Sequence, residues 1–254
     1  MITSKTNTAN RGIGFCQSGG GFSASFYHIG ALARMAEMGM LRHIEIIPTV
    51  SGGPIVSAAY YLMVKNLLEN NEDTDIKDAA YVKLVQDLEA HFLEAAQKNL
   101  RMRTFANPLK NMRMSLPNYS RSDAIGKLYE KYIYKPLLNV GNRRIKMRDL
   151  LIKSKDFTGD QYQLDDAAFG NSKRHYKVPI LIINVTSLNS GHNWYFSATK
   201  MGEVPPRNLN IRDIDKKNHY RRVRYDEITT GESNSNLSSA VAASACVPGL
   251  FPPI

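Results

Sequence analysis

The sequence predicts one α/β domain with a mostly parallel central sheet, and three segments predict it. Two are glycine-rich turns, Ser18-Gly19-Gly20-Gly21 and Thr49-Val50-Ser51-Gly52-Gly53, and each lies between a short apolar run and a helical apolar pattern. The third is the continuous apolar run at residues 178–188, which is typical of a strand covered on both faces. A chain of 254 residues with 43% hydrophobic content is long enough to enclose one large core.

The first turn carries three glycines at the start of an expected helix. An apolar strand at residues 13–16 precedes it, and the helix extends to about Glu37, with Gly39 as its stop. Backbone N–H groups at a helix N-terminus have no partner in the helix and can bind an anion. If that anion is the oxygen of a tetrahedral acyl intermediate, this turn is an oxyanion hole, in which one donor lowers the barrier by roughly 3 kcal/mol.

The second turn places a serine at a sharp corner. Residues 44–50 predict a short buried strand, and the helix after it begins near Pro54, which suits a first helical position because no N–H is needed there. A serine at such a corner projects its hydroxyl away from the sheet, while Gly52 and Gly53 let the strand and the helix approach closely. Ser51 is therefore a candidate nucleophile in a nucleophile elbow.

The remaining elements follow in order along the chain. Residues 70–95 have a helical apolar face, and Asn189-Ser190-Gly191 predicts a turn from the strand at 178–188 into a hairpin that ends at Ser197. Residues 202–236 are polar and rich in turn residues, which predicts a long surface loop. Residues 240–246 are small and predict a tightly packed helix, which Pro248-Gly249 stops.

This order of motifs resembles that of the patatin-like phospholipases. The glycine triplet, the serine corner and the small-residue helix leading into Pro248-Gly249-Leu250-Phe251-Pro252-Pro253 occur in the same order in that family. The stretch at residues 184–202 is also similar to bacterial members. The resemblance implies a three-layer fold and a lipid acyl hydrolase of the phospholipase A or lysophospholipase type, which cleaves glycerolipid esters with a Ser-Asp dyad and without a catalytic histidine, metal or cofactor.

The resemblance also assigns roles to individual residues. Ser51 matches the family's nucleophile, and the backbone of Gly19, Gly20 and Gly21 matches its oxyanion hole. The elbow residues are Thr49, Gly52 and Gly53. Two positions depart from the family pattern: Phe22-Ser23-Ala24 stands where the family usually has x-Arg-Gly after the triplet, and Thr49 stands where it often has glycine.

The dyad aspartate is missing from the expected place. In the family it lies in an Asp-Gly pair shortly after the Phe-Pro-Pro element, whereas this sequence stops at Ile254 and has no Asp after Asp226. A serine hydroxyl is a weak nucleophile until a base accepts its proton. We expect a C-terminally incomplete chain that is a fragment of a longer polypeptide. The alternatives are an aspartate supplied by a second chain, or an internal one, for which the candidates are Asp213, Asp215 and Asp226.

Residues 70–150 are expected to form a helical and basic insertion. Residues 98–148 carry thirteen Lys or Arg against two acids, Asp123 and Glu130, a local balance of +11 in a chain of net charge +10. Apolar side chains such as Met102, Phe105 and Met112 lie among these cations, which suits a lid or adsorption to an anionic bilayer. The alternative is a solvated basic face. Nucleic acid is a weaker interpretation of the charge, because no aromatic-interleaved RNA motif or zinc-ligand spacing accompanies it.

Other chemistries fit the sequence less well. The glycine turn lacks the Lys-Ser/Thr of a P-loop and the register of a dinucleotide fingerprint. A Ser-His-Asp hydrolase needs a late histidine, for which His219 is the candidate, and His192 is expected to support its own loop. No clustered oxygen ligands predict a calcium site. A different class of function also stays open: a membrane-binding or regulatory module on the same fold, inactive because its base is missing.

Composition predicts the compartment. Cys16 and Cys246 lie in apolar or small-residue runs, which predicts buried thiols rather than a disulfide. Residues 1–11 lack the apolar core of a signal peptide, and no apolar run has the length of a membrane span. We therefore expect a cytoplasmic protein in peripheral contact with phospholipid, or export without a cleaved Sec signal, with an activating protein or a second chain as a further partner.

Overall fold

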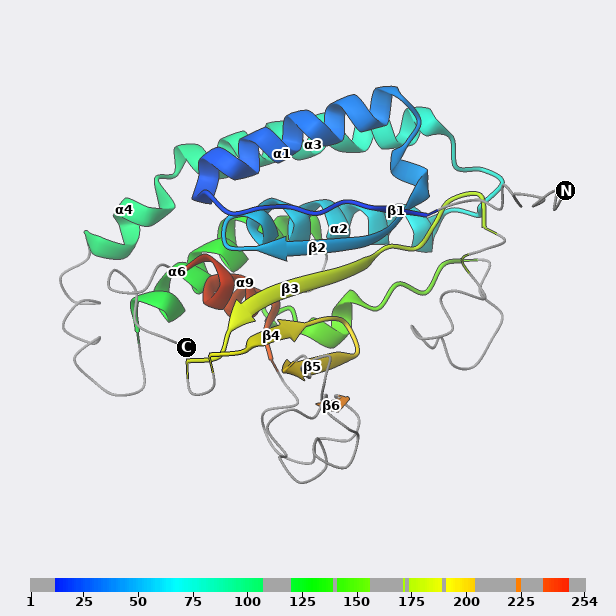
Figure 1. Ribbon diagram of the computed structural model, residues 1–254. Helices are drawn as coiled ribbons and strands as arrows, with labels where there is room; N and C mark the ends of the chain where they lie inside the picture. Colours follow the sequence, from blue (N-terminus) through cyan, green and yellow to red (C-terminus); the bar gives the residue numbers. More distant parts are fainter. Residues whose placement is uncertain are drawn as a thin grey trace, which may run out of the picture.

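The computed structural model describes residues 12–106, 120–138, 141–155, 171, 174–188, 191–203, 223–224 and 235–246. Within these residues the strands form one mixed sheet in the order β1-β2-β3-β4-β5-β6 (Figure 1). The strands β1 (Ile13–Gly14), β2 (Ile44–Val50) and β3 (Ile180–Thr186) are mutually parallel. The strands β4 (Asn193–Phe196), β5 (Lys200–Glu203) and β6 (Val223–Arg224) continue the sheet in antiparallel fashion. The predicted α/β fold is confirmed, with a sheet that is mixed rather than mostly parallel, and both glycine-rich turns lie in its parallel half.

The helices pack in two tiers above the sheet. In the first tier, α2 (Gly53–Asn70) packs on β2 and β3, and α9 (Leu237–Ala245) packs on β3 and α2. In the second, α1 (Gly21–Glu37) and α3 (Asp78–Gln97) pack on each other and on α2. The sheet and the two tiers make three layers (Figure 1). The chain continues through α4 (Leu100–Phe105), α6 (Arg121–Tyr129), a π-helical turn at Glu130–Tyr134, and 3-10 turns at Leu41–His43, Lys135–Leu137 and Met147–Leu150.

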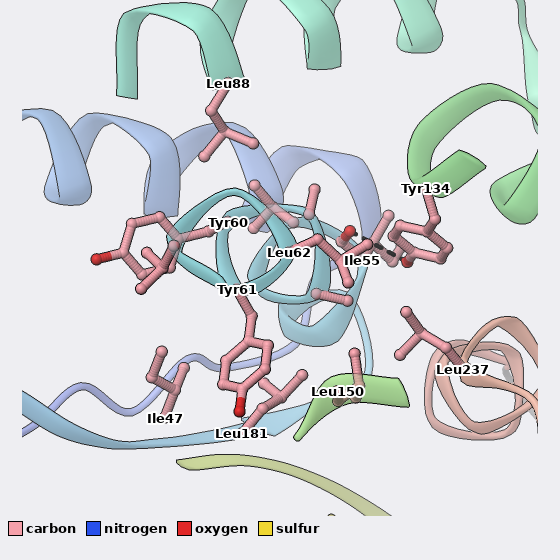
Figure 2. Packing of buried hydrophobic residues seen from close by; sticks show 14 of the residues in the cluster. Ile47, Ile55, Tyr60, Tyr61, Leu62, Leu88, Tyr134, Leu150, Leu181 and Leu237 are labelled. Atoms are coloured by element: carbon pink, nitrogen blue, oxygen red, sulfur yellow. Dashed lines mark hydrogen bonds between the residues drawn. The ribbon is translucent and has the colours of Figure 1, made fainter. Parts of the chain in front are cut away.

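The helix after the serine corner is the centre of the core. A helix with apolar side chains on all sides is stable only when protein surrounds it, and α2 is buried from Gly53 through Leu62. Figure 2 shows Tyr60, Tyr61 and Leu62 of α2 between Leu88 above and the sheet below. The hydroxyl of Tyr134 donates to the carbonyl of Ile55 at 3.2 Å, so the aromatic ring is buried with its polar group satisfied. This packing makes the first turn of α2 a rigid support for Ser51.

Most element boundaries agree with the sequence pattern. Gly39 ends α1 with a φ of 66°, and β3 lies between β2 and β4 as expected of a central strand. The predicted hairpin is present as β3 and β4. Strand β5 was not predicted, because the motif at residues 200–203 lacks alternation of apolar and polar side chains. The prediction of two buried thiols was wrong for Cys16, which is exposed because it follows the edge strand β1, whereas Cys246 is half-buried and both are free.

One buried carboxylate joins the basic segment to the last helix. Glu130, only 4% exposed, accepts hydrogen bonds from the backbone N–H of Ile145 at 2.8 Å and the hydroxyl of Ser238 at 2.5 Å. Arg144 lies 3.1 Å from the same carboxylate and also donates to Ser238. A buried charge is tolerated when it is paired and hydrogen-bonded in this way. The network fixes the start of α9 against α6 and so helps to place the residues near its end.

Several expectations concern residues outside the described ranges. These are the candidate bases Asp213, Asp215 and Asp226, the candidate His219, most of the loop predicted at 202–236, the apolar side chains from Leu109 to Leu116, and the segment from Val247 to Ile254. Among the helices that the structure does describe, none combines the length and the apolarity that crossing a bilayer requires.

Candidate active site

Ser51 adopts a strained conformation between β2 and α2. Its φ is +57°, and apart from Asn99 it is the one non-glycine residue with positive φ in the described ranges. A serine avoids this region unless the surrounding structure imposes it, and such strain concentrates at functional positions. The residue is half-buried, with buried Gly53 behind it at the start of α2. The corner therefore has the geometry expected of a nucleophile elbow.

The glycine-rich loop presses directly on this corner. A Cβ built on Gly19 would lie 2.7 Å from Cβ of Ser51 and 3.0 Å from its Oγ. A Cβ built on Gly52 would lie 2.4 Å from both the N and the O of Gly21, and one on Gly53 would lie 2.6 Å from the carbonyl oxygen of Gln17. Real Cβ atoms do not approach so closely, so these positions need glycine for reasons of space. The two turns that the sequence predicted separately form one site.

The backbone of the loop is arranged as an anion-binding site. Gly20 and Gly21 have φ of 135° and 63°, and Gly21 is the first residue of α1. Ser18, Gly19 and Gly20 are exposed, and the N–H groups of the three glycines donate to no acceptor among the described residues. Exposed, unpaired N–H groups at the start of a helix favour negative charge. The loop can therefore donate to an oxyanion that forms next to Ser51.

Two side chains of α1 hold the loop in place. The buried Ser25 hydroxyl lies 3.0 Å from the carbonyl oxygen of Gly52 and 3.2 Å from that of Gly21, so it bridges the two turns. The ring of His28, also buried, lies with Nε2 3.1 Å from the carbonyl oxygen of Ser18. Sequence reasoning missed Ser25, although its spacing of one helical turn from Gly21 is a signal that could have identified it.

A second support comes from the far end of the chain. The N–H of Ser51 donates to Oγ of Ser244 at 2.8 Å, and that hydroxyl donates to the carbonyl oxygen of Asn184 at 2.6 Å. Asn184 in turn donates from its side chain to the carbonyl of Thr49 at 3.1 Å. The strained corner is thus tied to α9 and to β3. A polar Asn in the otherwise apolar β3 was the signal that sequence reasoning left unused.

Replacing Ser244 with alanine is expected to lower kcat about tenfold with little change in KM, because the Ser51 N–H would lose its acceptor and the corner would relax. Steady-state hydrolysis of a soluble short-chain ester by the wild-type and variant proteins measures both constants. Ser239→Ala on the same helix is the matched control, and it should leave kcat unchanged. A Ser244→Ala enzyme with wild-type kcat would show that this hydrogen bond does not position the corner.

The remaining predicted site residues are accommodated without strain. The buried side chain of Thr49 turns away from the corner, and its hydroxyl donates to the carbonyl of Ile182 on β3 at 2.9 Å. The family usually has an arginine shortly after the glycine triplet, where this chain has Phe22-Ser23-Ala24. The guanidinium of Arg101 nevertheless lies near the triplet. A Cβ built on Gly21 would lie 2.2 Å from Nη2 of Arg101, which belongs to α4. A cation thus lies against the glycine loop from a different element.

Among the described residues, no carboxylate hydrogen-bonds to the hydroxyl of Ser51. Cys246, directly after α9, is a second side chain that becomes a nucleophile when ionised. Burial raises the pKa of its thiol, so it is a neutral and weak nucleophile near pH 7. The described residues also contain no group of three or more His, Cys, Asp or Glu arranged to hold a metal.

Comparison with known proteins adds one family and three remote structures. The family described as patatin-like phospholipase matches residues 15–254. No curated protein matches. Human GIVD cytosolic phospholipase A2, bound to methyl γ-linolenyl fluorophosphonate with terbium chloride, is 14% identical with a TM-score of 0.48, and covers 95% of this chain. The same enzyme without terbium is 12% identical over 93%, with a TM-score of 0.49, and the type III effector protein ExoU is 13% identical over 94%, with a TM-score of 0.34.

This chain spans only 30% of either phospholipase chain and 41% of ExoU. The family match, in contrast, extends over nearly the whole sequence and includes the serine corner, the glycine loop and α9. These are the same three elements that the structure brings together. The chain belongs to the patatin-like phospholipase family.

Proposed function

We propose that Ser51 is the nucleophile of a lipid acyl hydrolase that cleaves carboxylic esters of glycerophospholipids or lysophospholipids. The observation that carries the proposal is the contact between the strained Ser51 corner and the exposed Gly19–Gly21 loop. Family membership supports the class of reaction. A nucleophile and unpaired N–H donors within one contact of each other can attack a carbonyl and stabilise the charge that develops.

The proposed reaction has two steps. In the first, Oγ of Ser51 attacks the ester carbonyl carbon, its proton passes to an aspartate, and the carbonyl oxygen becomes an oxyanion beside the glycine loop. When the tetrahedral intermediate collapses, the C–O bond to the lipid alcohol breaks and the alcohol leaves with that proton. In the second, the aspartate takes a proton from water, which attacks the acyl-enzyme, and the fatty acid leaves as Ser51 regains its proton.

The aspartate of this dyad lies outside the described residues. The candidates within the chain are Asp213, Asp215 and Asp226, and the others are a downstream Asp-Gly pair of the same gene product or a second chain. Peripheral binding to an anionic phospholipid surface in the cytoplasm belongs to the same proposal, because the substrate resides in a bilayer.

Covalent labelling tests the nucleophile without a lipid substrate. A fluorophosphonate loses fluoride as the serine oxygen bonds to phosphorus, and we expect intact-protein mass spectrometry to show one adduct, mapped by peptide analysis to Ser51. The Ser51→Ala variant should take up no label, whereas Ser23→Ala, which alters an exposed serine of α1, should label like the wild type. An adduct on another residue, or none in any form that contains the dyad aspartate, would contradict the assignment.

The alternative is a catalytically inactive membrane-binding or regulatory module. In this alternative the fold is the same, but no carboxylate accepts the proton of Ser51. Two results together would support this alternative. The protein would bind lipid, and every form, including one extended beyond Ile254, would show neither labelling nor turnover.

A further inference from the structure

The surface next to the glycine loop is formed by a short helix with two different faces. On α4, Leu100 and Thr104 are buried at 1% exposure and anchor the helix to the body. On its other face Met102 is 66% exposed and Phe105 is 37% exposed. Three residues apart on a helix, these two side chains share one exposed face, which makes α4 a candidate binding surface. Asn99, with a φ of 51°, breaks the chain direction between α3 and α4 and so presents this helix outward.

Arginines lie over aromatic rings on α4 and on the elements next to it. The guanidinium of Arg121 lies 5.3 Å from the ring centre of Phe105, and that of Arg103 lies 5.6 Å from the ring of Tyr132. Arg101 lies 5.9 Å from the ring of Phe22. Aromatic rings with arginines over their faces, beside an exposed methionine, suit the interface of a bilayer, where apolar groups enter the acyl boundary and cations meet phosphates.

The acids near this surface do not cancel its charge. The carboxylate of Asp123 caps α6 through the N–H and hydroxyl of Ser120, and Glu130 is buried with Arg144. Glu94 lies 3.3 Å from Lys98. Lys127 and Lys131 add further positive charge on the following turns. The balance of the described groups is positive, so the surface complements an anionic partner.

The same helix contacts the catalytic loop. The Nη2 atom of Arg101 lies over Gly21, 2.2 Å from where its Cβ would be, and the Arg101 side chain also hydrogen-bonds to the buried Tyr129. Figure 1 shows α4 at the end of the molecule where β2 and β3 have their carboxyl ends and the two turns lie. A partner bound at α4 is therefore held beside the entrance to the glycine loop.

A groove of about 330 Å³ between α1 and α3 is a weaker candidate. It is lined by the exposed apolar Phe26 and Leu93, but also by Glu89, whose negative charge opposes an anionic surface. The cationic α4 surface fits the lipid substrate better in both charge and position.

We infer that α4 is the bilayer-docking tip of this protein: Met102 and Phe105 enter the surface of an anionic membrane, Arg101, Arg103 and Arg121 contact its phosphates, and the contact of Arg101 with Gly21 sets the catalytic loop at that surface. The choice of partner rests on the proposed lipid hydrolase function. Within the basic stretch of residues 98–148, this inference places the membrane contact on α4 and its immediate neighbours.

Flotation with vesicles tests the tip separately from catalysis. The full chain with Ser51→Ala is mixed with vesicles of phosphatidylcholine alone or with added phosphatidylglycerol, so that no lipid is consumed. We expect binding only with phosphatidylglycerol, weakened by salt. Adding Met102→Asp should weaken that binding roughly tenfold, because it removes an inserted side chain and adds an anion at the surface. Met102→Leu should retain it.

The control is a second methionine of similar exposure. Met38 is 56% exposed at the opposite end of α1, and Met38→Asp changes the net charge by the same amount. Vesicle binding by Met38→Asp should equal that of the parent, with circular dichroism confirming that all variants fold. Equal losses in the two Asp variants, or no preference for phosphatidylglycerol, would overturn the inference.

A mixed-sequence RNA tests the alternative partner. If Met102→Asp weakens RNA binding more than it weakens vesicle binding, the inference is overturned in favour of nucleic acid.

The result of the vesicle experiment does not depend on whether Ser51 is the nucleophile. If Met102→Asp weakens vesicle binding but Ser51 is not labelled, the docking role of α4 is supported and the hydrolase proposal is contradicted. If Ser51 is labelled but Met102→Asp leaves vesicle binding unchanged, the hydrolase proposal is supported and the docking role of α4 is contradicted.

Discussion

Replacing Ser51 with alanine is expected to lower fatty-acid release from phospholipid vesicles by roughly 10⁴-fold or more, because the oxygen that attacks the ester is removed. Mass spectrometry of the released fatty acids measures the effect. Gly19 lies close to the side chain of Ser51, and alanine is smaller than serine, so the substitution causes no clash and the fold should be kept. An unchanged melting temperature would confirm this. Release by Ser51→Ala at the wild-type rate would exclude Ser51 as the nucleophile.

The same assay locates the base. It compares the chain as given, a form extended through the next gene-encoded segment, and Asp→Asn variants at Asp213, Asp215 and Asp226. Release that appears only on extension places the dyad aspartate beyond Ile254. Release by the shorter form that one Asp→Asn variant abolishes places it at that residue, whereas release that survives all three variants and depends on protein concentration indicates a second chain.

Replacing Gly52 with alanine is expected to lower kcat by roughly 10² to 10³-fold, the effect of losing an oxyanion donor. The backbone of Gly52 has ordinary helical angles, so alanine is excluded only by space. Its Cβ would lie 2.4 Å from the N and O of Gly21, and backbone atoms cannot rotate away as a side chain can. The glycine loop must then move away from Ser51, at a cost to stability of roughly 1 to 3 kcal/mol.

Gly30 provides the matched control for this variant. It lies inside α1, the helix that follows the glycine loop, and a Cβ built there would meet no atom within 4 Å. Gly30→Ala should therefore keep wild-type activity and raise the free energy of unfolding by roughly 0.5 to 1 kcal/mol. Urea denaturation and initial rates on a short-chain ester measure both effects. Equal kinetics for the two alanine variants would mean that the close approach of Gly52 to Gly21 is not needed for catalysis.

The part of the site that sequence predicted well is the part that uses local backbone constraints. Each turn is encoded within a few residues, by adjacent glycines, by a serine between a strand and a helix, and by a proline at the start of α2. The local sequence pattern therefore predicted where Ser51 and the Gly19–Gly21 loop lie along the chain. Their mutual contact is a finding of the structure, in which the carboxyl ends of the neighbouring parallel strands β1 and β2 lie at one edge of the sheet.

What could not be predicted depends on contacts between distant segments. Nothing local to Ser244 shows that its hydroxyl accepts from Ser51, and nothing near Arg101 shows that it covers Gly21. The same reason explains why Cys16 was misjudged: an apolar neighbourhood in sequence does not reveal that β1 is an edge strand. The orientation of α4 depends on one left-handed residue, Asn99, whose conformation has no strong sequence signal.

The hydrogen bond between Ser51 and Ser244 joins residues 193 positions apart, and this separation has a consequence in time. A ribosome that has just made the corner needs roughly 10 to 40 s more to make the helix that steadies it. During that interval α1, α2 and the glycine loop can form, yet the Ser51 N–H has no partner. The strained corner therefore receives this support only late in synthesis, after the last described helix has been made.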